Sequence, residues 1–221
     1  MNNFDIYQLL NFIVNKDVYA QAIGPPEMEL ELKSKNLVHF RARLGLPETY
    51  IPGSANEGAG VTAVVEKDLL PFLVEATNQN PVNGIVVLDD WYFINDFYTA
   101  TSITTSKLKA GEISSRQNNY ITKPTIYHIA GEIVPTGIRV YPATLTGVTV
   151  SYYKQPKDPV FQIITDPLTL EMTYDTVNSV ELEWDDMNKL SILVLILQDL
   201  GLNVERQDVL QAAAKMIQTG K

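Results

Sequence analysis

The sequence predicts an α+β fold in which helices at both ends of the chain flank a β-rich middle. Three observations lead to this class. Apolar residues recur at helical spacing near the N-terminus, short runs rich in β-branched and aromatic residues fill the middle, and an apolar helical segment follows near the C-terminus. The expected architecture is N-terminal helices, a central antiparallel β region and a C-terminal helical hairpin.

A chain of 221 residues suits one elaborated domain, and we expect a single one here. Its predicted parts are a helical region at 1–50, a mobile loop at 51–60, a mainly β region at 61–184 and C-terminal helices at 185–221.

The N-terminal region predicts two helices. Apolar residues recur at helical spacing from Phe4 to Val14. A break at Gly24-Pro25-Pro26 precedes a second helix, expected at 26–44, with glutamates in its first turns and basic residues in its later turns. That order suits the helix dipole, and Gly45 supplies the stop.

Small and polar residues at 52–60 (PGSANEGAG) predict a mobile loop. A phosphate-binding loop is the alternative interpretation, but the segment lacks the Gly-Lys-Ser/Thr ending. Residues 61–76 leave two interpretations open. Their first part alternates like a strand, and the part around Pro71 suits a helix or a buried turn.

The middle of the chain predicts a series of short strands. One is expected at 85–88, after an Asn83-Gly84 turn. Between 102 and 174, β-branched and aromatic runs separated by Pro and Gly predict three or four antiparallel strands. Residues 114–120 (SSRQNNY) are expected to form a short helical turn.

Near the C-terminus, Val180, Leu182 and Trp184 alternate as a strand or an extended lead-in to a helix. Asp185 or Asp186 is expected to cap that helix, which runs to residue 200 and should be buried on several sides. A last helix is expected at 203–218.

Composition excludes several function classes. The net charge of −9 and the lack of a dense basic stretch argue against tight nucleic-acid binding. The chain has no cysteine, which removes disulfides and thiol chemistry. No secretory signal is visible at 1–15, and the most apolar run, 190–197, is too short for a membrane span of roughly 20 residues, so no membrane anchor is expected.

Catalytic patterns are also missing, and we expect no catalytic, cofactor-binding or metal-binding residues and no enzyme activity. His39, on a predicted charged helix, and His128, on a predicted strand, are interpreted as ordinary surface or edge residues. Asp89 and Asp90 adjoin an aromatic group that could stack on a sugar, but neighbours on a strand point to opposite faces. The aromatic group comprises Trp91, Tyr92, Phe93, Phe97 and Tyr98.

A second acidic cluster has a structural interpretation. Glu181 and Glu183 alternate with apolar residues and are interpreted as the solvated face of a strand. The wider stretch 166–186 holds seven carboxylates and no Lys or Arg, so we expect it to face solvent or the lumen of an assembly.

Six segments form an ordered set of packing and turn patterns. They are IYQLLNFIVNKD (6–17), the helix end HFRARLG (39–45), DLLPF (68–72), GEISSRQNNYITKPTIYHIAGEIVPTGIRVYP (111–142), VTVSYYKQPKDPVFQI (148–163) and VELEWDDMNKLSILVLILQDLGLNVE (180–205). As a set they resemble small virion proteins of tailed phages of gut Bacteroidota, including the crAss-like phages. The segment 52–65 lies outside the resemblance.

The resemblance implies a ring or adaptor protein of the portal–neck–tail assembly, made in the bacterial cytoplasm and located in the neck or tail of the virion. Such proteins form closed rings, often of about twelve identical copies, through head-to-tail contacts. Its implied partners are identical subunits, neighbouring portal, ring or tail proteins, and DNA that passes without specific binding. Residues 155–163, with Pro156 and Pro159, suit an extended arm laid across a neighbouring subunit.

Two other functions are weighed against the ring subunit. One is a carbohydrate- or receptor-binding module that uses the aromatic group at 91–98. The other is a glycan hydrolase of a phage tail, in which Asp89 and Asp90 would supply the carboxylates.

Overall fold

The computed structural model describes residues 1–14, 23–45, 67–109, 111–165, 167 and 172–202, and the α+β class is confirmed. The loop predicted at 51–60, the alternating run at 61–65 and the helix predicted at 203–218 lie outside the described residues. The chain divides into two compact units, described separately below. The helical unit is Met1–Leu44 with Pro156–Lys221, and the β unit is Gly45–Gln155. The single elaborated domain stays a prediction.

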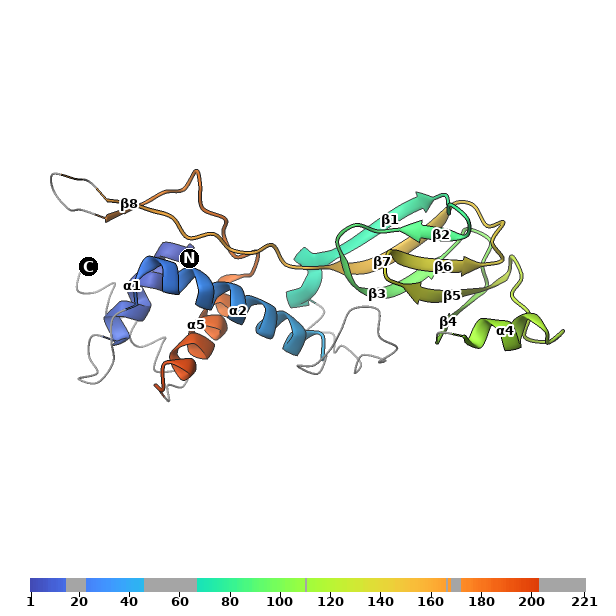
Figure 1. Cartoon of the computed structure of the whole chain (residues 1–221), viewed down its shortest axis with the longest axis horizontal. Helices are drawn as coiled ribbons and strands as arrows, with labels where there is room; N and C mark the ends of the chain where they lie inside the picture. The colour runs from blue at the N-terminus through green and yellow to red at the C-terminus, as the bar shows by residue number, and fades with distance from the viewer. Residues whose placement is uncertain (15–22, 46–66, 110, 166, 168–171, 203–221) are drawn as a thin grey trace. The chain divides into compact units, whose positions relative to one another are not determined.

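The described residues of the helical unit form three helices and a small hairpin (Figure 1). Its elements are α1 (Asn3–Val14), α2 (Pro25–Arg43), β8 (Ile163–Thr165), β9 (Met172–Tyr174) and α5 (Asp186–Asp199). Helix α5 packs against both α1 and α2, and β8 pairs with β9 in antiparallel register. The core between the helices is apolar, with fully buried side chains at Ile6, Leu10, Met28, Leu32, Phe40, Ile192, Leu193, Ile196 and Leu197.

The helix ends follow the predicted signals. The Glu27 carboxylate accepts the Gly24 N–H at 3.0 Å, which satisfies a backbone donor before α2. Helix α2 ends one residue before Leu44, and Gly45 takes a left-handed φ of 66°. At α5, the Asp185 carboxylate accepts the Asn188 N–H at 2.8 Å, so Asp185 is the N-cap.

The residues of the β unit that the structure describes form two sheets (Figure 1). The three-stranded sheet has the order β1-β7-β3, formed by β1 (Leu73–Gln79), β7 (Val148–Lys154) and β3 (Trp91–Tyr98). The four-stranded sheet has the order β2-β6-β5-β4, formed by β2 (Ile85–Val87), β6 (Gly137–Tyr141), β5 (His128–Val134) and β4 (Thr104–Leu108). A short 3-10 helix, η1 (Leu70–Phe72), precedes β1, so the helical interpretation of the part around Pro71 is confirmed.

The two sheets share one hydrophobic core. Strand β3 contributes Ile94 and Phe97, β7 contributes Val148 and Val150, and β5 contributes Ile129 from the other sheet. Their side chains are 1% exposed or less. Burial of apolar area from both sheets is therefore the main force that holds the β unit together.

Strands β4 and β5 are parallel, whereas every other strand pair among the described residues is antiparallel. The parallel pairing was not expected from the sequence. It arises because the chain between these strands, residues 109–127, returns to the starting end of the sheet before β5 begins. We call this segment the crossover. It contains the short helix α4 (Glu112–Gln117), where the sequence predicted a helical turn.

Tight backbone approaches fix the register of β2 against β6. Asn83 and Gly84 both have positive φ, as the predicted hairpin turn requires. At the start of β6, Gly137 has a φ of 141°, and a Cβ atom built there would lie 2.2 Å from the Val86 carbonyl oxygen. Only glycine fits this position without moving a strand.

The substitution Gly137→Ala is therefore expected to lower the free energy of unfolding of the β unit by about 1–3 kcal/mol. The matched control is Gly111→Ala, because Gly111 also has a positive φ (82°) but its added Cβ meets nothing within 4 Å. Thermal unfolding followed by circular dichroism measures both. Equal melting temperatures for the two variants would contradict the steric account.

Candidate functional site

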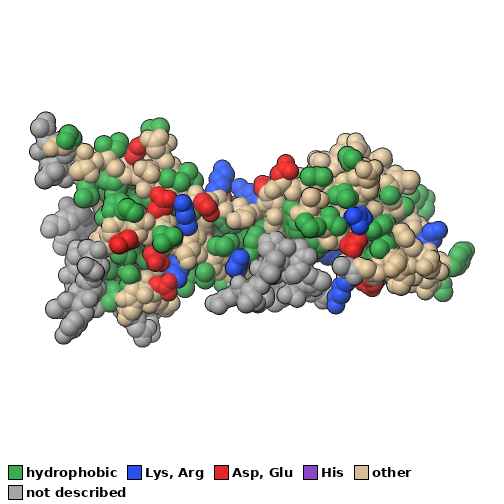
Figure 2. All heavy atoms as spheres, in the orientation of Figure 1, with side chains coloured by type: hydrophobic (Ala, Val, Ile, Leu, Met, Phe, Trp, Pro, Cys, Tyr) green, Lys and Arg blue, Asp and Glu red, His purple; other side chains and the backbone are tan. Residues whose placement is uncertain are grey.

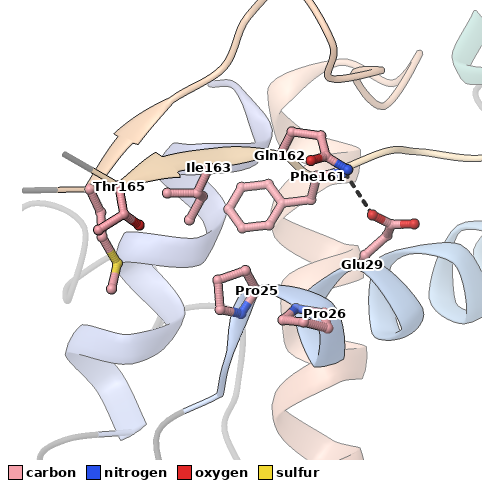
Figure 3. Close-up of a pocket in the computed structure, with 8 residues that line it drawn as sticks. Pro25, Pro26, Glu29, Phe161, Gln162, Ile163 and Thr165 are labelled. Carbon is pink, nitrogen blue, oxygen red and sulfur yellow. Dashed lines mark hydrogen bonds between the residues drawn. The ribbon is translucent and has the colours of Figure 1, made fainter. Parts of the chain in front are cut away.

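The helical unit contains a pocket of about 310 Å³ between the start of α2 and the β8–β9 hairpin (Figure 3). Pro25, Pro26 and Phe161 supply apolar walls, and Glu29 is the one titratable residue among the described residues that line it. The Glu29 carboxylate accepts the Phe161 N–H at 3.3 Å and pairs with Lys33 at 2.8 Å. Its pKa is lowered by the Lys33 hydrogen bond. The carboxylate therefore has structural partners, and the described lining residues include no second acid or base.

Next to this pocket, four aromatic rings form a connected group from α1, the segment before β8, and β9. Ring centroids of Tyr7 and Phe161 are 5.1 Å apart, those of Phe4 and Tyr174 are 5.7 Å apart, and those of Phe161 and Tyr174 are 5.9 Å apart. Such contacts tie distant segments together by packing. Because Phe161 is 3% exposed, this group is mainly interior structure.

Glu181 is not on a solvated strand face, so that interpretation was wrong. Its carboxylate accepts the Asn3 N–H at 2.8 Å and the Tyr174 O–H. Burial and this bond to Glu181 raise the pKa of Tyr174 to about 12. Alternation alone misled the interpretation, because the N-terminal helix covers this side of the extended segment.

Residues 156–163, part of the segment expected to suit an arm laid across a neighbouring subunit, pack within the helical unit of this chain, and the exchange between subunits stays a prediction. Pro156 and Pro159 are buried, and Val160 forms an antiparallel bridge with Val180 through two backbone bonds of 2.9 and 3.1 Å. The Asn36 side chain also donates to the Lys157 carbonyl at 3.2 Å. The prolines have no backbone N–H and so prevent a long run of strand hydrogen bonds, but the extended chain forms hydrogen bonds with side chains of its own unit.

His39 is buried, contrary to the surface position expected from its charged helix. Its side chain is 6% exposed, its Nε2 lies 2.9 Å from Oδ1 of Asn188, and its ring meets the Trp184 ring edge-on at 4.9 Å. The Trp184 indole N–H donates to Oδ1 of Asn36 at 2.7 Å. These side chains join α2 to the start of α5 and form a structural polar network.

His128, at the start of the inner strand β5, occupies the surface position that was expected. Its side chain is exposed, and its Nδ1 lies 2.7 Å from the Thr104 hydroxyl on β4. Among the described residues, no group of three or more His, Asp or Glu side chains could hold a metal ion.

Asp89 and Asp90 lie in an exposed bend before β3. The Tyr152 hydroxyl donates to the Asp90 carboxylate at 2.8 Å. Burial and this bond raise the pKa of Tyr152 to about 12. Asp90 therefore anchors a core tyrosine of β7.

The aromatic group at 91–98 does not form one exposed platform. Tyr92 is 2% exposed and Phe97 is fully buried, whereas Tyr98 is 40% exposed. Phe93 is half-buried under the Lys107 ammonium group, which lies 5.9 Å from its ring centroid. Strand alternation, with two register shifts in β3, divides these rings between opposite faces.

The described residues of the crossover are mostly exposed. Helix α4 has no buried residue. Figure 2 shows hydrophobic side chains projecting at the end of the β unit where Figure 1 places α4. Five large apolar residues in and beside the crossover are exposed: Ile103 (73%), Tyr120 (99%), Ile121 (89%), Ile126 (48%) and Tyr127 (52%).

Sequence reasoning did not identify these five residues as a group, and it assigned Ile126 and Tyr127 to a strand region. One signal was available. The stretch 112–119 has a single apolar residue, Ile113, and so lacks the apolar stripe that would hold a helix on a sheet, which indicates a segment without an internal packing partner.

No protein-family model matches the chain, and no curated protein matches it. Within the described ranges, no helix has both the length and the apolar character needed to cross a membrane.

Removing the Asn36 amide is expected to destabilise the helical unit. Asn36→Leu keeps the approximate volume but takes the acceptor away from the buried Trp184 N–H, at a cost of about 1–3 kcal/mol. Ser34→Leu, on the exposed side of the same helix, is the control. Denaturant unfolding followed by tryptophan fluorescence measures both, and an unchanged midpoint for Asn36→Leu would show that the network carries no stability.

Alkaline stability is expected to depend on Tyr152. The unfolded chain loses this proton near the ordinary pKa of 10.0, whereas the folded chain holds it to about 12. The stabilisation is therefore complete below pH 10 and is lost as the pH rises to about 12. Tyr152→Phe is expected to flatten this decline in unfolding experiments, while Tyr120→Phe, at a residue 99% exposed, leaves it unchanged.

Proposed function

We propose that this chain is a structural virion protein, a ring subunit of the portal–neck–tail assembly of a tailed phage that forms part of the DNA exit channel. The observation that carries this proposal is the exposed crossover with its five large apolar side chains. In this role the chain acts by binding copies of itself and neighbouring virion proteins, without catalysis.

An exposed apolar surface of this kind is typical of a protein-binding site. Soluble monomers seldom expose contiguous large apolar groups, because removing them from water is favourable. A helix as short as α4 is marginal by itself and gains most of its stability from packing. A partner that covers the crossover would supply that packing.

Several features of the candidate site favour a structural role over catalysis. Glu29, Glu181 and Asp90 each accept hydrogen bonds from groups that hold the fold together. Their carboxylates are thus used in positioning segments. The net charge of −9 suits a channel wall that lets DNA pass without binding it.

The type of assembly comes from the ordered resemblance to phage virion proteins. Ring subunits join through heterologous contacts, in which one face of a subunit meets a different face of the next. The chain is proposed to form such a ring of about twelve copies, in contact with portal, ring or tail proteins above and below.

A carbohydrate-binding or glycan-hydrolysing role has less support. Tyr92 and Phe97 are interior residues, so the rings at 91–98 offer no continuous surface for sugar stacking. Specific binding of the isolated chain on a glycan array would favour that role over the ring subunit.

Assembly of the isolated chain tests the proposal. Mass photometry over a range of concentrations is expected to show closed rings or ring fragments. Replacing Tyr120 and Ile121 together by Ser is expected to raise the concentration needed for assembly about tenfold or more, because apolar burial is lost.

The control replaces Val82 and Val87 by Ser. These residues are also exposed, at 69% and 57%, and lie in the same unit outside the crossover. The control is expected to assemble like the unchanged chain. A chain that stays monomeric at all concentrations and is absent from the virion neck would refute the proposed function.

A further inference from the structure

We propose that the crossover of one copy docks onto the acidic face of the helical unit of a second copy. The acidic face is defined as residues 172–187, which comprise β9, the turn that follows it and the lead-in to α5. This inference rests on the proposed ring function and names the two surfaces that join neighbouring subunits.

The crossover side of the contact combines apolar and basic groups. Tyr120 and Ile121 are almost fully exposed, at 99% and 89%. The crossover carries Lys109, Arg116 and Lys123 against one acid, Glu112. Glu112 meets Arg116 at 3.4 Å, which leaves the excess positive charge at the two lysines.

The fold of the crossover presents these groups in a defined way. The Asn119 side-chain oxygen accepts the Ile121 N–H at 2.9 Å, and the Asn119 backbone carbonyl accepts the Lys123 N–H at 2.9 Å. At the base, the Ile103 N–H donates to the Tyr127 carbonyl at 2.7 Å. These bonds fix the backbone around Tyr120 and Ile121 before any partner binds, which reduces the entropy cost of docking.

The acidic face has the complementary composition. It carries five carboxylates, at Asp175, Glu181, Glu183, Asp185 and Asp186, and no Lys or Arg. It also exposes three large apolar side chains, at Met172 (53%), Val177 (88%) and Met187 (51%).

The turn that presents Val177 is fixed by Asp175. Its carboxylate accepts the backbone N–H groups of Val177 at 3.0 Å and Asn178 at 3.1 Å, as well as the Asn178 side chain at 2.6 Å. These bonds, led by that of the Asn178 side chain, lower the pKa of Asp175, so it stays negative at neutral pH. Asp186 already meets the N-terminal ammonium group at 2.9 Å, so the negative charge that remains lies toward Asp175 and Asp185.

Charge complementarity identifies a second copy as the partner. Exposed apolar side chains accompanied by an excess of basic residues on one unit match exposed apolar side chains accompanied by acidic residues on the other unit, and both sets are present on every copy. Opposite charges at a rim select orientation and speed association, while the apolar centre supplies affinity. Different faces meet, so the contact is heterologous, as a ring requires.

Site-specific photo-crosslinking tests the contact. The chain has no cysteine, so Ile121→Cys provides one attachment point for a maleimide-benzophenone probe. Full-length chains labelled with light and heavy nitrogen are mixed before assembly, irradiated and digested for mass spectrometry. Crosslinks from residue 121 to 172–187 that join light and heavy peptides are expected. Val82→Cys, at an exposed position of the same unit, is the control and is expected to give none to this face.

Salt and charge reversal provide a second readout. Lys123→Glu is expected to weaken assembly about tenfold or more at low salt, with a smaller effect at high salt, because screening removes the charge contribution. Lys67→Glu makes the same charge change at an exposed position outside the crossover and is expected to have little effect.

Two outcomes overturn the inference while leaving the ring function intact. In the first, rings form but the crosslinks from residue 121 go to other surfaces or do not form. In the second, rings form but no crosslink connects a light peptide with a heavy one. A chain that forms no oligomer at all refutes the ring function and this contact together.

Discussion

Parallel pairing of β4 with β5 is the constraint on which the most distinctive surface of this protein depends. Antiparallel neighbours can be joined by a two-residue turn, whereas parallel neighbours need a crossover of a dozen residues or more. In most folds a helix in such a crossover packs onto the sheet and buries its apolar side. Here α4 buries no residue, so the connection that the sheet requires becomes an exposed projection with apolar side chains.

Polar groups inside the two units serve the opposite purpose, because they join segments that are far apart in the chain. In the helical unit, Asn36 receives the Trp184 N–H and Glu29 receives that of Phe161. In the β unit, the Lys107 ammonium group donates to the Ile94 and Asn95 carbonyls, which bridges β4 to the edge of β3 that pairs with no strand among the described residues. Burial lowers the pKa of Lys107, which reflects the free-energy cost of placing its charge between β4 and β3.

Local signals made α1, α2 and α5 predictable from the sequence, since helical periodicity and caps such as Glu27 and Asp185 lie within a few residues of the elements they define. The buried state of His39 and the bonds of Glu181 were not predictable in this way. Both depend on contacts with residues more than a hundred positions away, Asn188 and Asn3. The parallel partner of β4 was missed for the same reason, because strand periodicity carries no information on direction.

The separation of the two complementary surfaces has a consequence for assembly. Each copy carries one crossover and one acidic face, so an open row of subunits leaves one of each exposed at its ends. Closing the row into a ring covers both, which removes the remaining apolar side chains from water and pairs the remaining charges. Closure by this route needs no self-complementary patch. The crossover, which connects the parallel strands β4 and β5, thus carries apolar side chains whose burial favours closure of the proposed ring.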